Sequence, residues 1–185
     1  LNVQANSDIS GSGTPTTLNN ITTGNLTGTG AANSTTMTGA QLDAILIGAG
    51  TIDLGGGSDT LNITSTSADL NTLGSTDDAA IANLENISAS TAGAGVIVDL
   101  SAQTENFTVT GSNFADTLTG GSGADVIDAG AGNDVITGGA GADTIDGGAD
   151  DDTINLANGD FASGESLTGN AGTDQIVLTN ATTVD

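Results

Sequence analysis

Hydrophobic residues recur every nine positions between residues 111 and 155. The repeated position holds Leu118, Ile127, Ile136, Ile145 and Ile154 in five successive units. Each is the middle of a three-residue segment, which is typical of a short strand with one inward side chain. The six Gly-rich residues before it predict a tight turn, since Gly adopts positive φ without strain. Two units therefore form one 18-residue rung of a flattened coil, and the pattern predicts an all-β, parallel β-roll or β-solenoid.

The units read GSNFADTLT from residue 111, GGSGADVID from 120, AGAGNDVIT from 129, GGAGADTID from 138 and GGADDDTIN from 147. A four-residue insertion at 156–159 interrupts the period. It resumes as DFASGESLT from 160 and GNAGTDQIV from 169. An isolated copy, LGGGSDTLN, occupies 54–62, and the unit before it, 45–53, keeps Ile52 but lacks the Asp.

The rest of the chain is Thr/Asn/Gly-rich and less regular. Alternating apolar residues at 96–100 and the run at 107–110 predict short strands, and residues 1–44 predict weak ones. The segment 77–86 is compatible with either a short helix or an irregular rung. We therefore predict two regions, an irregular β-solenoid over 1–110 and a regular β-roll over 111–185.

An Asp occupies position six of every unit between 111 and 155: Asp116, Asp125, Asp134, Asp143 and Asp152. Unit n lies above unit n+2, so the Asp residues form two rows, one at each edge of the coil. Parallel strands lie about 4.8 Å apart, and carboxylates at that spacing repel by roughly 3 kcal/mol per pair at an effective dielectric of 20. A narrow core cannot offset this repulsion alone, so we expect cations between the rungs.

Composition supports a cation-binding role. The 185-residue chain carries 23 acidic residues, no Lys, Arg or His, and a formal net charge of −23. Such a surface does not bind nucleic acid or insert in an anionic membrane unaided. The chain also lacks Cys and Tyr, which leaves few groups for acid–base or nucleophilic catalysis, so we expect no enzyme. Without His or Cys, zinc and copper are disfavoured. Carboxylates and turn carbonyls are hard oxygens that suit Ca²⁺.

The units GGSGADVID and GGAGADTID resemble the haemolysin-type nonapeptide GGxGxDxUx of RTX proteins. The resemblance covers 111–155 well and 160–177 in part. It implies a parallel β-roll with several Ca²⁺ ions, about three or more, between alternate repeats. It also implies that the five position-six Asp residues are ligands, together with turn carbonyls around Gly121, Gly123, Gly130, Gly132, Gly139 and Gly141. Phe114 and Asp150 depart from the pattern at position four, as does Ala129 at position one.

Other acidic residues fit the pattern less completely. Asp174 and Glu165 hold position six beyond the insertion, and Asp59 holds it in the isolated copy. We include Asp174 and Asp59 as candidate metal ligands. Asp128 and Asp146 lie at position nine and are expected to face solvent.

Residues 82–90, ANLENISAS, are similar to xxhExhxhxx stretches between β-roll blocks of bacterial surface-layer and large adhesin proteins. This resemblance implies a calcium-binding structural segment of a secreted, extracellular or cell-surface bacterial protein, such as an S-layer, adhesin or filament. RTX proteins typically leave the cell by type I secretion and fold on Ca²⁺ outside it. The alternative is the accessory roll of a secreted toxin, protease or lipase. Self-association into a lattice or filament is a further expectation, because open solenoid ends expose unpaired strand edges.

Overall fold

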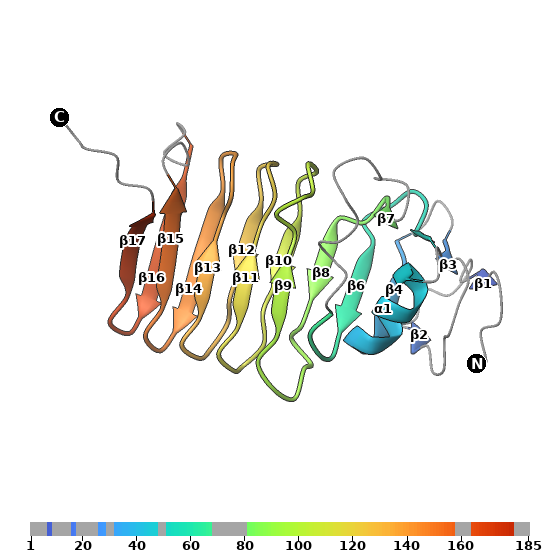
Figure 1. Cartoon of the computed structure of the whole chain (residues 1–185), viewed down its shortest axis with the longest axis horizontal. Helices are drawn as coiled ribbons and strands as arrows, with labels where there is room; N and C mark the ends of the chain where they lie inside the picture. The colour runs from blue at the N-terminus through green and yellow to red at the C-terminus, as the bar shows by residue number, and fades with distance from the viewer. Residues whose placement is uncertain are drawn as a thin grey trace.

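The computed structural model describes residues 7–8, 16–17, 26–28, 32–47, 51–67, 81–157 and 164–179. Its strands lie side by side as successive rungs along one axis, with β1 (Ser7–Asp8) and β17 (Gln175–Thr179) at opposite ends (Figure 1). All strand pairs described are parallel. The described residues therefore form an all-β parallel solenoid with one short helix, and the nine-residue period predicts this solenoid.

Three sheets form the walls of the coil. The long sheet has the spatial order β16 (Ser166–Ala171), β14 (Thr144–Ala149), β12 (Val126–Asp128), β10 (Thr108–Thr110), β8 (Asn86–Ser88), β6 (Thr60–Ile63), β4 (Ser34–Met37) and β2 (Thr16–Thr17). Opposite it, the C-terminal sheet has the order β17 (Gln175–Thr179), β15 (Thr153–Ala157), β13 (Val135–Thr137), β11 (Thr117–Thr119) and β9 (Ile97–Asp99). The N-terminal sheet has the order β1 (Ser7–Asp8), β3 (Leu26–Thr27), β5 (Ile52–Asp53) and β7 (Ile81–Ala82).

Strand register confirms the 18-residue rung in the repeats. Thr108 pairs with Val126, and Val126 pairs with Thr144. Past the insertion the spacing becomes 22 residues, since Thr144 pairs with Ser166. The rung is four residues longer at this point, and the last two units stack on the roll. The predicted insertion at 156–159 does not lie wholly between strands, because Leu156 and Ala157 belong to β15 and pair with Leu178 and Thr179. Residues 158–159 lie outside the described residues. The long sheet also continues upstream of residue 110 through β8. The division of the chain into two regions at residue 110 stays a prediction.

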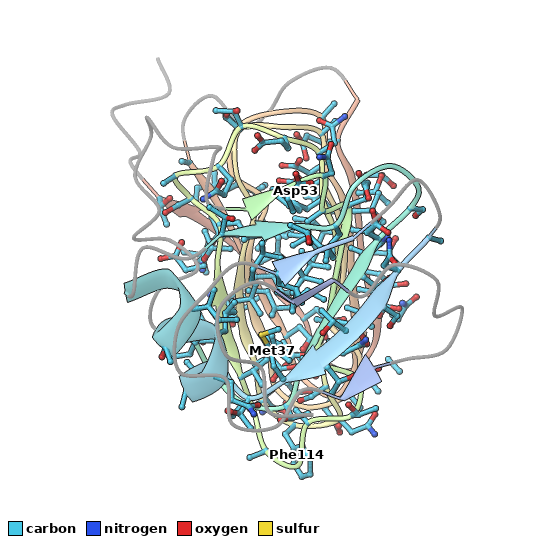
Figure 2. The ribbon with its side chains drawn as sticks, turned by 90° about the vertical axis from the view of Figure 1, so that its right-hand side faces the viewer. Met37, Asp53 and Phe114 are labelled. Carbon is cyan, nitrogen blue, oxygen red and sulfur yellow. The ribbon has the colours of Figure 1, made fainter. Side chains whose placement is uncertain are left out.

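The core is a single layer of apolar side chains between the sheets. Leu118, Ile136 and Ile154 stack in register on the C-terminal sheet, and Ile127 and Ile145 on the long sheet. All five are at most 2% exposed. Figure 2 looks along the coil and shows Met37 inside it and Phe114 at the tip of a turn. Because each strand in the repeats is three to six residues long, it contributes only one or two side chains to this layer.

The helix α1 (Gly39–Ile47) was not predicted, because we assigned weak strands to residues 1–44 and read 45–53 as a nonapeptide. Its start follows from a capping box. The Thr38 hydroxyl accepts the Gln41 N–H (3.2 Å), and the Gln41 side chain accepts the Thr38 N–H (2.7 Å). Leu42 and Ile45 are then buried against the core. Ile52 lies in β5, as its position in that unit suggested.

The other upstream predictions fare better. The predicted strands at 96–100 and 107–110 correspond to β9 and β10. The segment 77–86 forms an irregular rung where it is described, with β7 at Ile81–Ala82 and β8 beginning at Asn86. Residues 77–80, together with Leu18 and Ile21 of the weak-strand prediction, lie outside the described residues.

Candidate calcium-binding site

The five repeat Asp residues are buried at the ends of the turns. Each is at most 2% exposed, although carboxylates are almost never fully buried without a partner. They lie in two rows. We call the row before β11, β13, β15 and β17 the first edge and the row before β12, β14 and β16 the second edge. The described part of the chain contains no ion pair to neutralise either row, since the sequence has no basic side chain.

Hydrogen bonds link the first edge from rung to rung. The N–H of Asp116 donates to Asp134 Oδ1 (2.7 Å), and the N–H of Asp134 donates to Asp152 Oδ1 (2.9 Å). The N–H of Asp152 donates in turn to Asp174 Oδ1 (3.1 Å). Each carboxylate therefore replaces a carbonyl in the backbone ladder, and these bonds offset part of the repulsion between neighbouring rungs.

The second edge follows the same rule. The N–H of Phe107 donates to Asp125 Oδ1 (2.8 Å), and the N–H of Asp125 donates to Asp143 Oδ1 (2.9 Å). The N–H of Asp143 donates to Glu165 Oε1 (3.2 Å). Glu165 and Asp174 thus continue the two rows beyond the insertion, as their phase predicted, although Asp174 is exposed at the end of the stack.

In the units that begin with Gly, the second oxygen of the carboxylate lies beneath that Gly. A Cβ added at Gly138 would lie 2.4 Å from Asp143 Oδ2, and one at Gly147 would lie 2.6 Å from Asp152 Oδ2. These distances are shorter than any real Cβ contact. The carboxylate therefore occupies the space of a side chain in these units, whereas the unit of Asp134 has Ala129 at position one.

The second oxygens differ in how they are satisfied. Asp125 Oδ2 accepts the Gly121 N–H (2.8 Å). Asp116 Oδ2 accepts the Ser112 N–H (2.6 Å), and the Ser112 hydroxyl binds Asp116 Oδ1 (2.9 Å). In contrast, Asp134 Oδ2 and Asp152 Oδ2 are buried and have no hydrogen-bond partner. An unpaired buried carboxylate oxygen is costly, and a bound cation would satisfy both of these oxygens.

Backbone carbonyls line the same turns. The Gly121 oxygen lies 2.1 Å from where a Gly139 Cβ would be, and the Gly123 oxygen 2.0 Å from a Gly141 Cβ. Carbonyls of one rung thus face the position-two and position-four glycines of the next. The Gly121 carbonyl accepts the Ala140 N–H (3.0 Å) and keeps a second lone pair.

Four of the glycines whose carbonyls were predicted as ligands have a positive φ: Gly130, Gly132, Gly139 and Gly141. Asp150, which replaces Gly at position four, also adopts positive φ (78°), so the last regular turn keeps its shape. The assignment of these carbonyls as calcium ligands remains a prediction.

Burial raises the pKa of three repeat carboxylates, Asp125, Asp134 and Asp152. Desolvation is the largest cause for Asp134, whose pKa rises to about 7, and the negative charges of Asp116, Asp152 and Asp150 add to it. The hydrogen bond from the Asp116 N–H acts in the opposite direction. Desolvation also raises the pKa of Asp125 and of Asp152, against hydrogen bonds from backbone N–H groups. Ionising these three carboxylates is therefore unfavourable unless a cation lies beside them.

The donor set fits calcium. Among the described residues, no three acidic side chains converge on one point, so an ion between rungs must take its remaining ligands from carbonyls or water. Ca²⁺ accepts six to eight such oxygens with flexible geometry, whereas Mg²⁺ demands a stricter octahedron and keeps its waters. The residues that would hold it are the position-six carboxylates and the turn carbonyls.

Several residues of this edge structure were not predicted. Glu85 lies at position six of its rung, and Phe107 lies at the same position of the next rung of the long sheet. The sequence spacing did not reveal the position of Glu85, because the upstream rungs vary in length. A side-chain row also runs along position five. Asn106 accepts the Ala124 N–H (2.7 Å), Asn133 accepts the Asp151 N–H (3.3 Å), and Asp151 accepts the Thr173 N–H (2.7 Å).

The position-nine residues differ from each other. Asp128 is exposed, as expected. Asp146 is half-buried and accepts a hydrogen bond from the Asn170 side chain, so it does not simply face solvent.

Comparison with known families matches this geometry. The family model of the RTX calcium-binding nonapeptide repeat (4 copies) matches residues 108–136 and 130–160. Residues 108–160 are therefore RTX repeats, a type of repeat that binds Ca²⁺ at several sites. Neither the curated proteins nor the solved structures provide a match. Among the described residues, no helix has the length and apolar character needed to cross a bilayer.

Proposed function

We propose that this chain is a calcium-dependent structural segment of a secreted bacterial surface or extracellular matrix protein, and that it has no catalytic role. The observation that carries the proposal is the pair of buried carboxylate rows without a basic counter-charge. Calcium between the rungs would convert the repulsion within each row into cohesion. A rigid, elongated rod suits a lattice, an adhesin stalk or a filament.

Calcium would also act as the folding signal. Because a site made of two rungs does not exist in the unfolded chain, the free energy of calcium binding becomes free energy of folding. A cytosol poor in calcium would keep the repeats unfolded for passage through a type I channel. Calcium outside the cell would then fold them.

The test is far-UV circular dichroism of the EDTA-treated chain during titration with Ca²⁺, with Mg²⁺ as the parallel titration. We expect a cooperative gain of β signal with Ca²⁺ only. Asp134→Asn should require more Ca²⁺ for the transition, whereas Asp128→Asn, which removes the same charge from an exposed position, should not. A full β spectrum in EDTA would contradict the proposal.

The open end of the roll supports self-association. Within the described residues, β16 and β17 are the last strands of their sheets, and the terminal rung leaves Ile176 55% and Leu178 54% exposed. Unpaired edges with apolar neighbours favour addition of another strand. Sedimentation velocity in Ca²⁺ should show concentration-dependent oligomers that Ile176→Lys abolishes. A monomer at all concentrations would refute this part of the proposal.

A further inference from the structure

Asp59 is the most deeply buried acidic residue outside the RTX repeats. Strand register gives its place, because Leu61 pairs with Ile87 and Thr35 pairs with Leu61. These pairs align Asn33, Asp59 and Glu85 at position six of three successive rungs of the long sheet. The rungs are 26 residues apart, so no nonapeptide period connects them, and the matched RTX region begins only at residue 108.

The contacts of Asp59 reproduce those of the repeat carboxylates. Its Oδ1 accepts the Asn33 N–H (2.6 Å) and the Asn33 side-chain amide (3.2 Å). Its own N–H donates to Glu85 Oε2 (2.8 Å). The backbone N–H of Asp59 therefore donates to a carboxylate of the next rung, as the N–H of Asp134 donates to Asp152. The acceptor for Asp59 is a Glu in place of an Asp.

The unsatisfied atom is also the same. Asp59 is 0% exposed, and its Oδ2 is buried without a hydrogen-bond partner. Only Asp134 Oδ2 and Asp152 Oδ2 share this state among the carboxylates of the described residues, and both belong to RTX repeats. Asn33 is uncharged and does not neutralise the Asp59 carboxylate, and the chain has no basic side chain that could do so.

The turn before Asp59 has the backbone of a repeat turn. Gly55 and Gly57, at positions two and four, have φ of 85° and 139°. The corresponding glycines of the repeat at 138–146, Gly139 and Gly141, have φ of 100° and 133°. The isolated unit thus keeps the conformation that presents carbonyl oxygens in the repeats.

We infer that Asp59 and Glu85 form an additional calcium site, outside the RTX repeats and between two rungs of the irregular half. Asp59 Oδ2 and the Glu85 carboxylate supply charged oxygens, and the carbonyls of residues 55–57 supply neutral ones. Asn33 is a positioning residue that holds Asp59 Oδ1 and, through its amide, the Leu54 carbonyl (2.9 Å). Glu85 is only half-buried, so the ion can enter from its side. The inference is independent of the surface role proposed above.

Native mass spectrometry of the full chain at stepped free Ca²⁺ tests the site by counting ions. We expect Asp59→Asn and Glu85→Gln each to carry one ion fewer than the wild type. Asp128→Asn is the matched control and should lose none, whereas Asp134→Asn should lose ions of the repeats and keep this one. Equal counts and affinities for Asp59→Asn, Glu85→Gln and wild type would overturn the inference while leaving the repeat sites intact. A wild-type chain with no bound Ca²⁺ would refute both the repeat sites and this additional site.

Hydrogen–deuterium exchange provides a measurement that does not depend on the folding of a variant. In the wild type, Ca²⁺ should slow exchange of the 54–62 amides. It should do so in Asp134→Asn as well, since that substitution lies several rungs away. If exchange at 54–62 in the wild type does not respond to Ca²⁺, the site does not exist.

Discussion

The substitution Gly141→Ala should destabilise the folded roll strongly, because both the backbone conformation and the available space at Gly141 exclude a Cβ. Gly141 has φ of 133°, a conformation that costs a non-Gly residue about 1–3 kcal/mol. Its Cβ would also lie 2.0 Å from the Gly123 carbonyl oxygen and 2.8 Å from the Gly123 carbonyl carbon. Both atoms are backbone in the adjacent rung and cannot rotate away. Relieving such a contact costs about 1–3 kcal/mol more, so we expect the free energy of unfolding to fall by about 2–6 kcal/mol.

Urea unfolding in saturating Ca²⁺, followed by circular dichroism, measures this loss. With a slope of about 2 kcal/mol per molar urea, the midpoint should fall by about 1–3 M. The matched control is Gly93→Ala, because a Cβ there meets nothing within 4 Å and its φ is not positive. That control should leave stability unchanged or raise it by up to about 1 kcal/mol. Equal midpoints for the two variants would refute the close approach of successive turns.

Three further changes test separate parts of the structure. Ile136→Ala, at 0% exposure, should cost about 2–5 kcal/mol in the same urea assay, whereas its neighbour Val135, 39% exposed, should tolerate Ala with a much smaller loss. Asp150→Gly relieves a positive φ of 78° and should stabilise the roll by about 1 kcal/mol, which a lower urea midpoint would contradict. The pKa of Asp134 is raised to about 7, so the calcium-free folded state binds more protons than the unfolded chain between about pH 4 and 7. The stability of the calcium-free fold should therefore fall as pH rises through that window. Calcium must displace that proton, so the Ca²⁺ affinity should rise over the same window, and Asp134→Asn should make both dependences shallower.

The regular half of the fold could be read from the sequence because its period is constant. Once Ile127 and Ile145 are assigned to one sheet, every other residue of the repeats has a fixed phase, and the register confirms it. The four extra residues in one rung were predictable for the same reason, although Leu156 and Ala157, which the prediction placed in the insertion, extend β15. Burial and the two carboxylate rows then follow from alternation and from the number of residues in each rung.

The irregular half could not be read in this way. Its rungs are separated by 26 residues in the long sheet, so nothing in the sequence spacing aligns Asp59 with Glu85. Only strand pairing does so. The helix α1 was missed although its capping box, Thr38 to Gln41, is visible in the sequence, because the short apolar run after it also fits a strand. The hydrogen-bond partners of the buried carboxylate oxygens could not be predicted either. Sequence alone does not show that Ser112 donates to Asp116 while Asp134 keeps an unpaired oxygen.

The two halves are stabilised in different ways. Upstream of residue 110 the strands and their flanks bury two or three apolar side chains each, such as Leu61 with Ile63 in β6, or Val96 and Val98 with Leu100 around β9. From 111 to 153 the rungs bury one large aliphatic residue per nine, and a carboxylate takes the other inward place. Replacing an apolar side chain with a buried charge gives up hydrophobic stabilisation of about 1.5–3 kcal/mol and adds a desolvation penalty. Because the repeats make this exchange in every unit, we expect them to depend on a bound cation for their stability, whereas apolar packing contributes more to the stability of the irregular half.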